Sequence, residues 1–295
     1  MRFANVAGRA SLVVADGGIV DLEDISRGRF DADPHLAFGR WDELCAWVAD
    51  GSDVPHSGRR VDEREFGAPS PRPEQIFAVG LNYADHAAET DLALPGNPIV
   101  FTKFVSSLSG PVTTVALPSD TVDWEIELVV VIGEGGRDIP AERVWDHVAG
   151  MTVGQDLSER TVQWWGPPAQ FSLAKSFAGF TPVGPTIVTP GELRAAGHDP
   201  LDLALRCELV APEERREVLQ QGRTRQLIFD VPTLIATLSG IVELRPGDLV
   251  FTGTPDGVGM GRDPQRYLRA GDVLVSTIEG IGTIRQEFVG GQERT

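Results

Sequence analysis

A continuous apolar run, Leu128 to Ile132, follows a short acidic stretch and constrains the fold of this chain more than any other feature. Such a run, closed by Gly133, is typical of a strand buried on both faces. Because side chains alternate along a strand, Glu125 and Glu127 should point the same way, with Asp123 beside them. Parallel carboxylates repel each other, so a hard divalent cation is their natural partner. A solvated, acidic strand end is the simpler alternative.

Two further segments carry groups that could complete such a site. Asp156 follows the apolar stretch from Val148 to Val153, where a second strand would end, and it could supply a third oxygen ligand. Lys175 lies inside an otherwise apolar run, Phe171 to Phe177. A lysine in that setting is usually a surface residue with its stem on apolar groups, but near three carboxylates it could hold an anionic substrate.

A loop rich in glycine, threonine and proline follows the predicted strand at 249–252. Its glycines, Gly257, Gly259 and Gly261, have the spacing G-x-G-x-G, which is not the G-x-G-x-x-G of dinucleotide sites, and no G-K-[ST] is present. We therefore interpret it as a loop whose backbone N–H groups and Thr254 hydroxyl meet a substrate carboxylate, not a nucleotide.

His86 and Glu89 stand three residues apart in the stretch N-Y-A-D-H-A-A-E. On a helical turn this spacing places them on one face, where the carboxylate would orient the imidazole and raise its basicity, as a general base requires. The alternative is an exposed histidine with an ordinary contact along the helix. Nearby Gly80, Asn82 and the stretch 95–97 suit a loop that becomes ordered when ligand binds.

Short strands dominate the pattern of residues 76–295, and helical patterns are few. Strands are predicted at 76–79, 99–103, 128–132, 148–153, 203–210, 249–252, 272–278 and 282–288, and helices at 142–147 and 231–238. So many strands with so few helices favour a closed or rolled β core, which is a mostly β fold of the α+β class.

Residues 1–65 are predicted to form a small α+β domain of their own. Strands at 11–15 and 19–22 flank an Asp-Gly-Gly turn, and Trp41 to Ala49 fits a short helix. Charged residues and three prolines then mark residues 66–75 as a linker to the strand-rich domain, residues 76–295.

Composition limits the partners and the location of the protein. The 295 residues include 26 Lys and Arg against 43 Asp and Glu, and the formal net charge of −17 argues against nucleic acid and anionic membranes as partners. Two cysteines are too few for a disulfide framework or a zinc site. No signal-peptide pattern opens the chain and no apolar run nears the roughly 18 residues of a membrane span, so a cytoplasmic location is expected.

In their order along the chain these motifs resemble the fumarylacetoacetate hydrolase (FAH) superfamily, in particular its bacterial acylpyruvase and 2-hydroxyhepta-2,4-diene-1,7-dioate isomerase branch. The resemblance extends from about Pro73 to Phe288 and is carried by residues 79–89, 123–133, 154–156, 175–177 and 246–259. It implies an FAH-like mixed β-roll with peripheral helices and a homodimer.

The resemblance also implies the roles of individual residues. A Mg²⁺ or Mn²⁺ ion is expected on Glu125, Glu127 and Asp156. The catalytic residues are expected to be His86 and Glu89, on a mobile lid, together with Lys175. The residues predicted to bind substrate are Tyr83, Lys103, Gln226 and Thr254.

The implied chemistry acts on small 2-oxo acids. We expect hydrolysis of a C–C bond in an acylpyruvate-type 2,4-dioxo acid through a metal-stabilised enolate, with His86 and Glu89 activating water and Lys175 adding positive charge. Oxaloacetate decarboxylation and isomerisation of a 2-hydroxy-dienoate would use the same site. A non-catalytic protein that binds oxo acids is a further alternative.

Two positions depart from the family pattern. Ala178 follows the lysine motif where many members carry Asp, and Thr161 stands where a second Asp is common. The bulky stretch 163–168, Q-W-W-G-P-P, is a candidate to line the pocket. These changes leave the predicted metal ligands intact and the substrate open, with a bulky apolar or aromatic acyl group among the alternatives.

Overall fold

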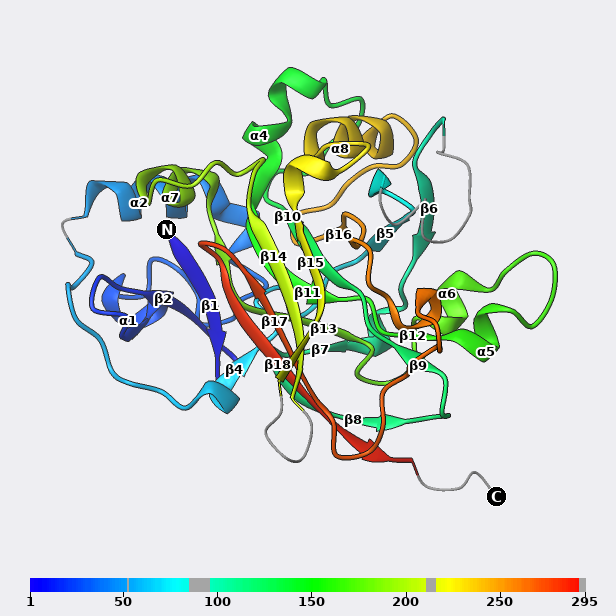
Figure 1. Ribbon diagram of the computed structural model, residues 1–295. Coiled ribbons are helices and arrows are strands. Elements are labelled where there is room, and N and C mark those ends of the chain that lie inside the picture. Colours follow the sequence, from blue (N-terminus) through cyan, green and yellow to red (C-terminus); the bar gives the residue numbers. More distant parts are fainter. Residues whose placement is uncertain (52, 85–95, 211–215, 292–295) are drawn as a thin grey trace.

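Two β-sheets carry most of the molecule in the computed structural model, which describes residues 1–51, 53–84, 96–210 and 216–291 (Figure 1). The larger sheet has 11 strands, and its main path runs in the order β3-β2-β1-β13-β11-β10-β16-β5-β6. Its strands are β1 (Arg2–Val6), β2 (Arg9–Val13), β3 (Ile19–Asp21), β5 (Ile76–Gly80), β6 (Ile99–Thr102), β10 (Ile126–Ile132), β11 (Val148–Gln155), β13 (Thr181–Val188) and β16 (Leu249–Phe251), with β4 (Phe66–Gly67) and β7 (Leu108–Ser109) paired beside this path.

The second sheet has five strands in the order β15-β14-β17-β18-β8. These are β8 (Val112–Leu117), β14 (Ala204–Val210), β15 (Arg216–Arg223), β17 (Val273–Ile278) and β18 (Gly282–Gly290). A two-stranded pair, β9 (Val122–Asp123) with β12 (Ser158–Glu159), lies apart from both sheets. The prediction of a mostly β fold of the α+β class is thus confirmed.

The helices are short and lie around the sheets (Figure 1). They are α1 (Leu22–Ile25), α2 (Trp41–Asp50), α4 (Val144–His147), α5 (Arg160–Gln163), α6 (Phe171–Ala174), α7 (Pro190–Ala195) and α8 (Val231–Ser239), with 3₁₀ turns at 38–40, 63–65, 105–107, 141–143, 224–226 and 259–261. The Asp230 side chain caps α8 by accepting a hydrogen bond from the backbone of Thr233. Within the described ranges, every helix is too short or too polar to cross a bilayer.

Strand β10 separates two hydrophobic cores. All seven of its residues are buried, as the continuous apolar run predicts. Leu128 and Val130 pack in a core shared with the five-stranded sheet, whereas Val129 and Val131 pack in a second core with residues from the N-terminal segment. Glu127 and Val129 are two residues apart on the strand, so their side chains point to the same face. The Glu127 carboxylate therefore leaves β10 on the side of the second core.

The N-terminal segment joins the main sheet directly. β1 pairs antiparallel with β13, with Ala4 opposite Thr186. Phe3 and Trp41 lie in the same core as Val129 of β10. Residues 1–65 therefore extend the large sheet, and they also form a small buried cluster around Ala4, Val6 and Ile19. A separate N-terminal domain with boundaries at 65 and 76 remains a prediction.

Candidate active site and metal centre

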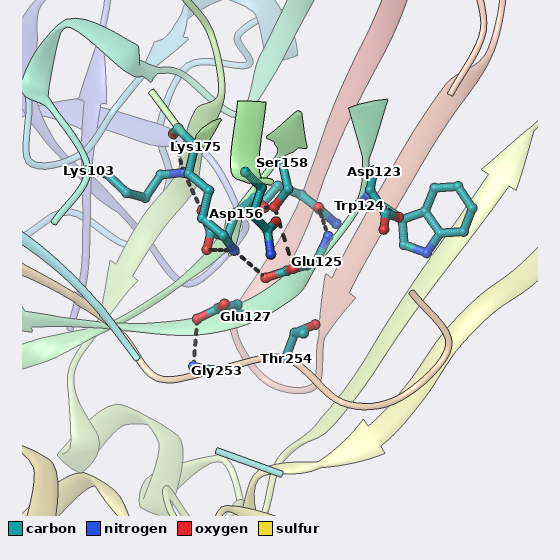
Figure 2. Close-up of polar contacts among 12 residues, drawn as sticks. Lys103, Asp123, Trp124, Glu125, Glu127, Asp156, Ser158, Lys175, Gly253 and Thr254 are labelled. Carbon is teal, nitrogen blue, oxygen red and sulfur yellow. Dashed lines mark hydrogen bonds and ion pairs between the residues drawn. The ribbon is translucent and has the colours of Figure 1, made fainter. Parts of the chain in front are cut away.

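The three residues predicted as metal ligands, Glu125, Glu127 and Asp156, lie close together at the N-terminal end of β10 (Figure 2). Each offers one carboxylate oxygen, and these oxygens lie within 4.8 Å of one another. Pairing of β10 with β11 brings them together, because Glu127 lies opposite Gly154 and the Asp156 N–H donates to the Glu125 carbonyl at 2.9 Å. We refer to these three residues as the acidic triad.

Lys175 lies among the carboxylates of the acidic triad and not at the surface. Its Nζ donates to Glu125 Oε2 at 2.7 Å and also to Asp156 Oδ2 (Figure 2). Burial disfavours the charged ammonium, but the charges of Asp156 and Glu125 outweigh it and raise the pKa of Lys175. The lysine is therefore a fixed positive charge inside the site, which disagrees with the alternative of a surface residue.

Lys103, predicted to bind substrate, is also buried, and it holds the same aspartate from the other side. Its Nζ donates to Asp156 Oδ1, to the Lys175 carbonyl at 2.7 Å and to the Phe180 carbonyl at 3.2 Å. These three bonds use all three protons of an ammonium group. Burial lowers the pKa of Lys103. In this structure Lys103 anchors Asp156, and a contact with substrate remains a prediction.

Arg160 completes the charge network, and sequence reasoning assigned it no role. Its side chain is 5% exposed, and Nη2 lies 2.7 Å from Glu125 Oε1 and 2.8 Å from Asp123 Oδ2. Asp123 is thereby paired with Arg160 and is not part of the acidic triad. Arg160 stands four residues after Asp156 in the same motif, and this position is the sequence signal that could have pointed to its role.

The glycine-rich loop after β16 uses its backbone donors on the protein's own carboxylates. The Gly253 N–H donates to Glu127 Oε2 at 2.6 Å, and the Gly259 N–H donates to Asp123 Oδ1 at 2.7 Å. These N–H groups orient acids of the site, because a buried carboxylate of the chain itself needs donors. A contact of this loop with a substrate carboxylate remains a prediction.

The remaining predicted residues lie in different settings. The Thr254 hydroxyl is buried and donates to the Ile126 carbonyl at 2.8 Å, whereas Gln226 is exposed in the 3₁₀ turn at 224–226. Their contacts with substrate remain predictions. His86 and Glu89 lie outside the described residues, so their predicted roles rest on the sequence alone.

Glu127 shows why a divalent cation fits the acidic triad. It is 1% exposed, and no Lys or Arg of the described chain lies within ion-pair distance of it. Burial first, and then the charges of Asp156 and Glu125, raise the pKa of Glu127 well above its usual value of 4.5. A carboxylate in this environment is stabilised by a proton or by a hard cation, and the all-oxygen donor set suits Mg²⁺ or Mn²⁺.

Comparison with known proteins agrees with the motifs and the site. Residues 75–289 match the family model described as fumarylacetoacetate (FAA) hydrolase C-terminal. The chain belongs to the fumarylacetoacetate hydrolase family. The predicted family resemblance is therefore confirmed, and the acidic triad of this FAH-family protein lies within the matched region.

Relatives of this FAH-family protein include enzymes with different names. The human mitochondrial oxaloacetate tautomerase FAHD2A is 42% identical over 229 residues, which cover 77% of this chain and 70% of that protein. The 2,4-didehydro-3-deoxy-L-rhamnonate hydrolase of Sphingomonas sp. (strain SKA58) is 39% identical over 282 residues, 95% of this chain and 91% of that one. A crystal structure of a candidate HpcE protein from Mycobacterium smegmatis superposes with a TM-score of 0.90 at 52% identity, covering 99% of this chain and 100% of that chain.

Proposed function

We propose that this protein is a metal-dependent hydrolase that cleaves a carbon–carbon bond in an acylpyruvate-type 2,4-dioxo acid. The observation that carries the proposal is the buried acidic triad. Two of its members, Glu125 and Asp156, accept hydrogen bonds from Lys175. Glu125, Glu127 and Asp156 would hold Mg²⁺ or Mn²⁺. When bound, such an ion supplies a Lewis acid for the carboxylate and 2-oxo oxygens of the substrate.

The chain's own residues prepare the site for an anionic substrate. Lys175 places a buried positive charge beside the carboxylates, where it can stabilise negative charge that develops on a substrate oxygen. Lys103 and Arg160 hold Asp156 and Glu125 in position, so the site needs little rearrangement during the reaction.

Water activation is assigned to His86 and Glu89 on sequence grounds. The oxygen of water joins the acyl carbon at C4, the bond between C3 and C4 breaks, and C3 takes up a proton. The products are a carboxylate, released with one proton, and pyruvate, so atoms and charges balance.

The Sphingomonas relative supports the hydrolytic reaction. Its name describes a hydrolase for a sugar acid oxidised at carbons 2 and 4, which is a 2,4-dioxo acid. The alignment covers 95% of this chain and so includes most of the N-terminal segment, whereas the human tautomerase aligns with 77%.

Enol–keto tautomerisation of oxaloacetate is a second candidate, favoured by the 42% identity with the human enzyme. This reaction moves a proton between C3 and the enol oxygen and needs no attack by water. Oxaloacetate decarboxylation and 2-hydroxy-dienoate isomerisation remain alternatives at the same site. The homodimer and the cytoplasmic location remain predictions from the sequence.

A substrate panel tests the proposal. Acetylpyruvate and oxaloacetate are incubated with the protein in Mg²⁺ or in a chelator, and pyruvate release and loss of enol absorbance are recorded separately. We expect Mg²⁺-dependent release of acetate and pyruvate from acetylpyruvate, which Glu127→Gln abolishes and the surface control Glu23→Gln retains. Loss of the enol absorbance of oxaloacetate without cleavage of acetylpyruvate would favour the tautomerase. Turnover that is unaffected by chelation would contradict a metal-dependent reaction.

A further inference from the structure

A buried glutamine, Gln220 on β15, joins the five-stranded sheet to the strand that carries two acids of the triad. The residue is 1% exposed, and its Oε1 accepts the Ile126 N–H at 3.0 Å. Its Nε2 donates to the Thr254 hydroxyl at 2.8 Å and to the Pro255 carbonyl at 2.8 Å, which uses both amide protons. One side chain therefore bonds to the start of β10 and to the loop after β16, and sequence reasoning assigned it no role.

An irregularity in β15 turns Gln220 toward the interior. The register of β15 against β14 shifts between Cys207 and Glu208, and this shift leaves Leu219 as an extra residue on β15. Leu219 and Gln220 are both buried, whereas Gln221 is exposed, and regular alternation would bury only one of two adjacent residues. A β-bulge of this kind redirects a side chain, and here it directs the glutamine at the site.

The bonds of Gln220 take the place of strand pairing at the start of β10. β16 pairs with β10 from Val129 to Val131, and Ile126 lies before that ladder. The Ile126 N–H donates to Gln220, and its carbonyl accepts the Thr254 hydroxyl at 2.8 Å. Because buried backbone groups need partners, two side chains do here what a neighbouring strand does further along β10.

Both groups that the glutamine holds are direct neighbours of the metal centre. Ile126 stands between Glu125 and Glu127 in the sequence. Gly253 directly precedes Thr254, and its N–H donates to Glu127 Oε2 at 2.6 Å (Figure 2). The glutamine thus fixes the backbone between two of the acids and also the loop that orients one of them. A displacement of either segment would change the spacing of the carboxylates.

The loop and β15 are also packed closely enough to limit their relative movement. A Cβ added at Gly257 would lie 2.2 Å from the Leu219 carbonyl oxygen, and one added at Gly222 would lie 2.8 Å from the Pro255 Cβ. Neither distance is possible without a shift of the backbone or of the proline ring. β15 is therefore a rigid support for the loop, and the amide of Gln220 extends that support to β10.

We propose that Gln220 is a positioning residue of the metal centre, holding Ile126 and Thr254 so that the acidic triad keeps the spacing that Mg²⁺ requires. Mg²⁺ demands near-ideal octahedral geometry, so its affinity is sensitive to small displacements of the carboxylates. Groups that orient the ligands of a metal typically contribute about 10- to 100-fold to its affinity. The inference rests on the proposed function for the identity of the ion, but not on the substrate or the reaction.

Adjacent glutamines on one strand provide the test and its control. Gln220→Met keeps the approximate length of the side chain but removes the amide, and Gln221→Met makes the same change at the exposed neighbour. Calorimetric titration of the metal-free proteins should show Mg²⁺ binding about 10- to 100-fold weaker in Gln220→Met. Its melting temperature should also fall, because the Ile126 N–H loses its acceptor. Gln221→Met should keep the wild-type affinity and melting temperature.

Electron paramagnetic resonance of bound Mn²⁺ separates positioning of the ligands from support of the fold. The zero-field splitting of Mn²⁺ depends on the symmetry of its ligands. At saturating Mn²⁺, Gln220→Met should give a spectrum that differs from the wild type, and Gln221→Met should not. If the glutamine served only the stability of the fold, the folded fraction of Gln220→Met would hold Mn²⁺ with the wild-type spectrum.

A second pair of variants tests the other end of the contact and decides the question if Gln220→Met does not fold. Thr254→Val removes the hydroxyl that links Gln220 to the Ile126 carbonyl, whereas Thr254→Ser keeps it. We expect weaker Mg²⁺ binding in Thr254→Val and wild-type binding in Thr254→Ser. Because substrate is absent from these titrations, contacts of Thr254 and of the buried Tyr83 with substrate, which remain predictions, do not enter the result.

Failure of the inference and failure of the proposed function give different results. Wild-type Mg²⁺ affinity or an unchanged Mn²⁺ spectrum in Gln220→Met would overturn the inference alone, and so would equal Mg²⁺ affinities in Thr254→Val and Thr254→Ser. Absence of Mg²⁺ and Mn²⁺ binding by the wild-type protein would overturn the proposed function and the inference with it.

Discussion

Two groups of acids in this protein have carboxylate oxygens at similar distances from one another but differ in burial and in their partners. Asp21, Glu23 and Asp24 bring three carboxylate oxygens within 4.8 Å of one another at the surface, as the acidic triad does in the interior. In the surface group, Arg9 donates to Asp21 and Glu23, and the Asp21 side chain also caps α1. Proximity of carboxylates alone therefore does not identify a metal site.

The pKa values of Asp21 and Glu127, one acid from each group, shift in opposite directions. Burial opposes the ionisation of Asp21, but hydrogen bonds from Arg9 and from the Asp24 backbone outweigh it and lower the pKa of Asp21. Burial dominates at Glu127 and raises its pKa. Asp21 and Glu23 are already paired with Arg9, whereas Glu127 has no ion-pair partner in the described chain, and this difference favours a metal site in the interior.

The largest expected effect comes from Lys103→Met, which removes a buried cation from Asp156. Breaking one side of a buried ion pair typically costs about 3–5 kcal/mol in the free energy of unfolding, because the remaining charge stays buried. Asp156 keeps its bond from Lys175, so the loss should lie near the lower end of this range. Urea unfolding in the presence of a chelator measures it, with Arg143→Met, which removes the exposed contact to Asp146, as control. A loss as small as that of the control would show that Lys103 does not anchor the site.

Glu127→Gln should have the next largest effect, on metal affinity. The substitution keeps the shape of the side chain but removes the charge that a cation would neutralise, so Mg²⁺ or Mn²⁺ should bind about 10²-fold more weakly or worse. Calorimetry on the metal-free protein measures the change, and Asp21→Asn in the surface group should leave the affinity unchanged. Equal losses in both variants would remove the distinction between the two groups.

The sequence predicts the strands that follow a simple pattern and misses those that depend on their neighbours. β10 is a continuous apolar run, and α8 carries a cap and a helical repeat, so both are predicted. β13 contains Pro182, Gly184 and Pro185, which normally argue against a strand. It forms because β1 and β11 supply partners on its two sides, with a register shift opposite β11.

The same distinction applies within the site. The spacing of Glu125 and Glu127 on one strand places both on the same side, so these acids are predictable from the sequence. Arg160 is different, because only the folded chain brings it to Asp123 and Glu125, which lie about 35 positions earlier. Its pairing depends on the separate β9–β12 contact, in which Ser158 lies opposite Asp123, and no local pattern predicts that register.

The third prediction concerns the pH dependence of stability, which has opposite signs for Glu127 and Asp21. In the metal-free protein Glu127 binds its proton more tightly when folded, so stability falls as pH rises from the usual 4.5 through the raised pKa. Asp21 binds its proton more weakly when folded, so its contribution is present above the usual 3.8 and is lost as pH falls through the lowered pKa. Chelator-treated wild type should lose stability relative to Glu127→Gln on going from acid to neutral pH, and saturating Mg²⁺ should remove that loss. Parallel pH profiles for the wild type and Glu127→Gln would contradict this account.

The smallest effect is expected for Arg9→Met in the surface group. Arg9 is close to half exposed, and water and salt screen its attraction to Asp21 and Glu23. Asp21 keeps its bond from the Asp24 backbone after the substitution, so α1 keeps its cap. The denaturation midpoint should therefore stay close to that of the wild type, and any small difference should vanish in concentrated salt. Metal affinity should not change, because the carboxylates proposed to bind the ion are those of the interior. A large loss of stability that persists in high salt would mean that the surface acids need their arginine as much as Asp156 needs its lysines, and the contrast between the two groups would not hold.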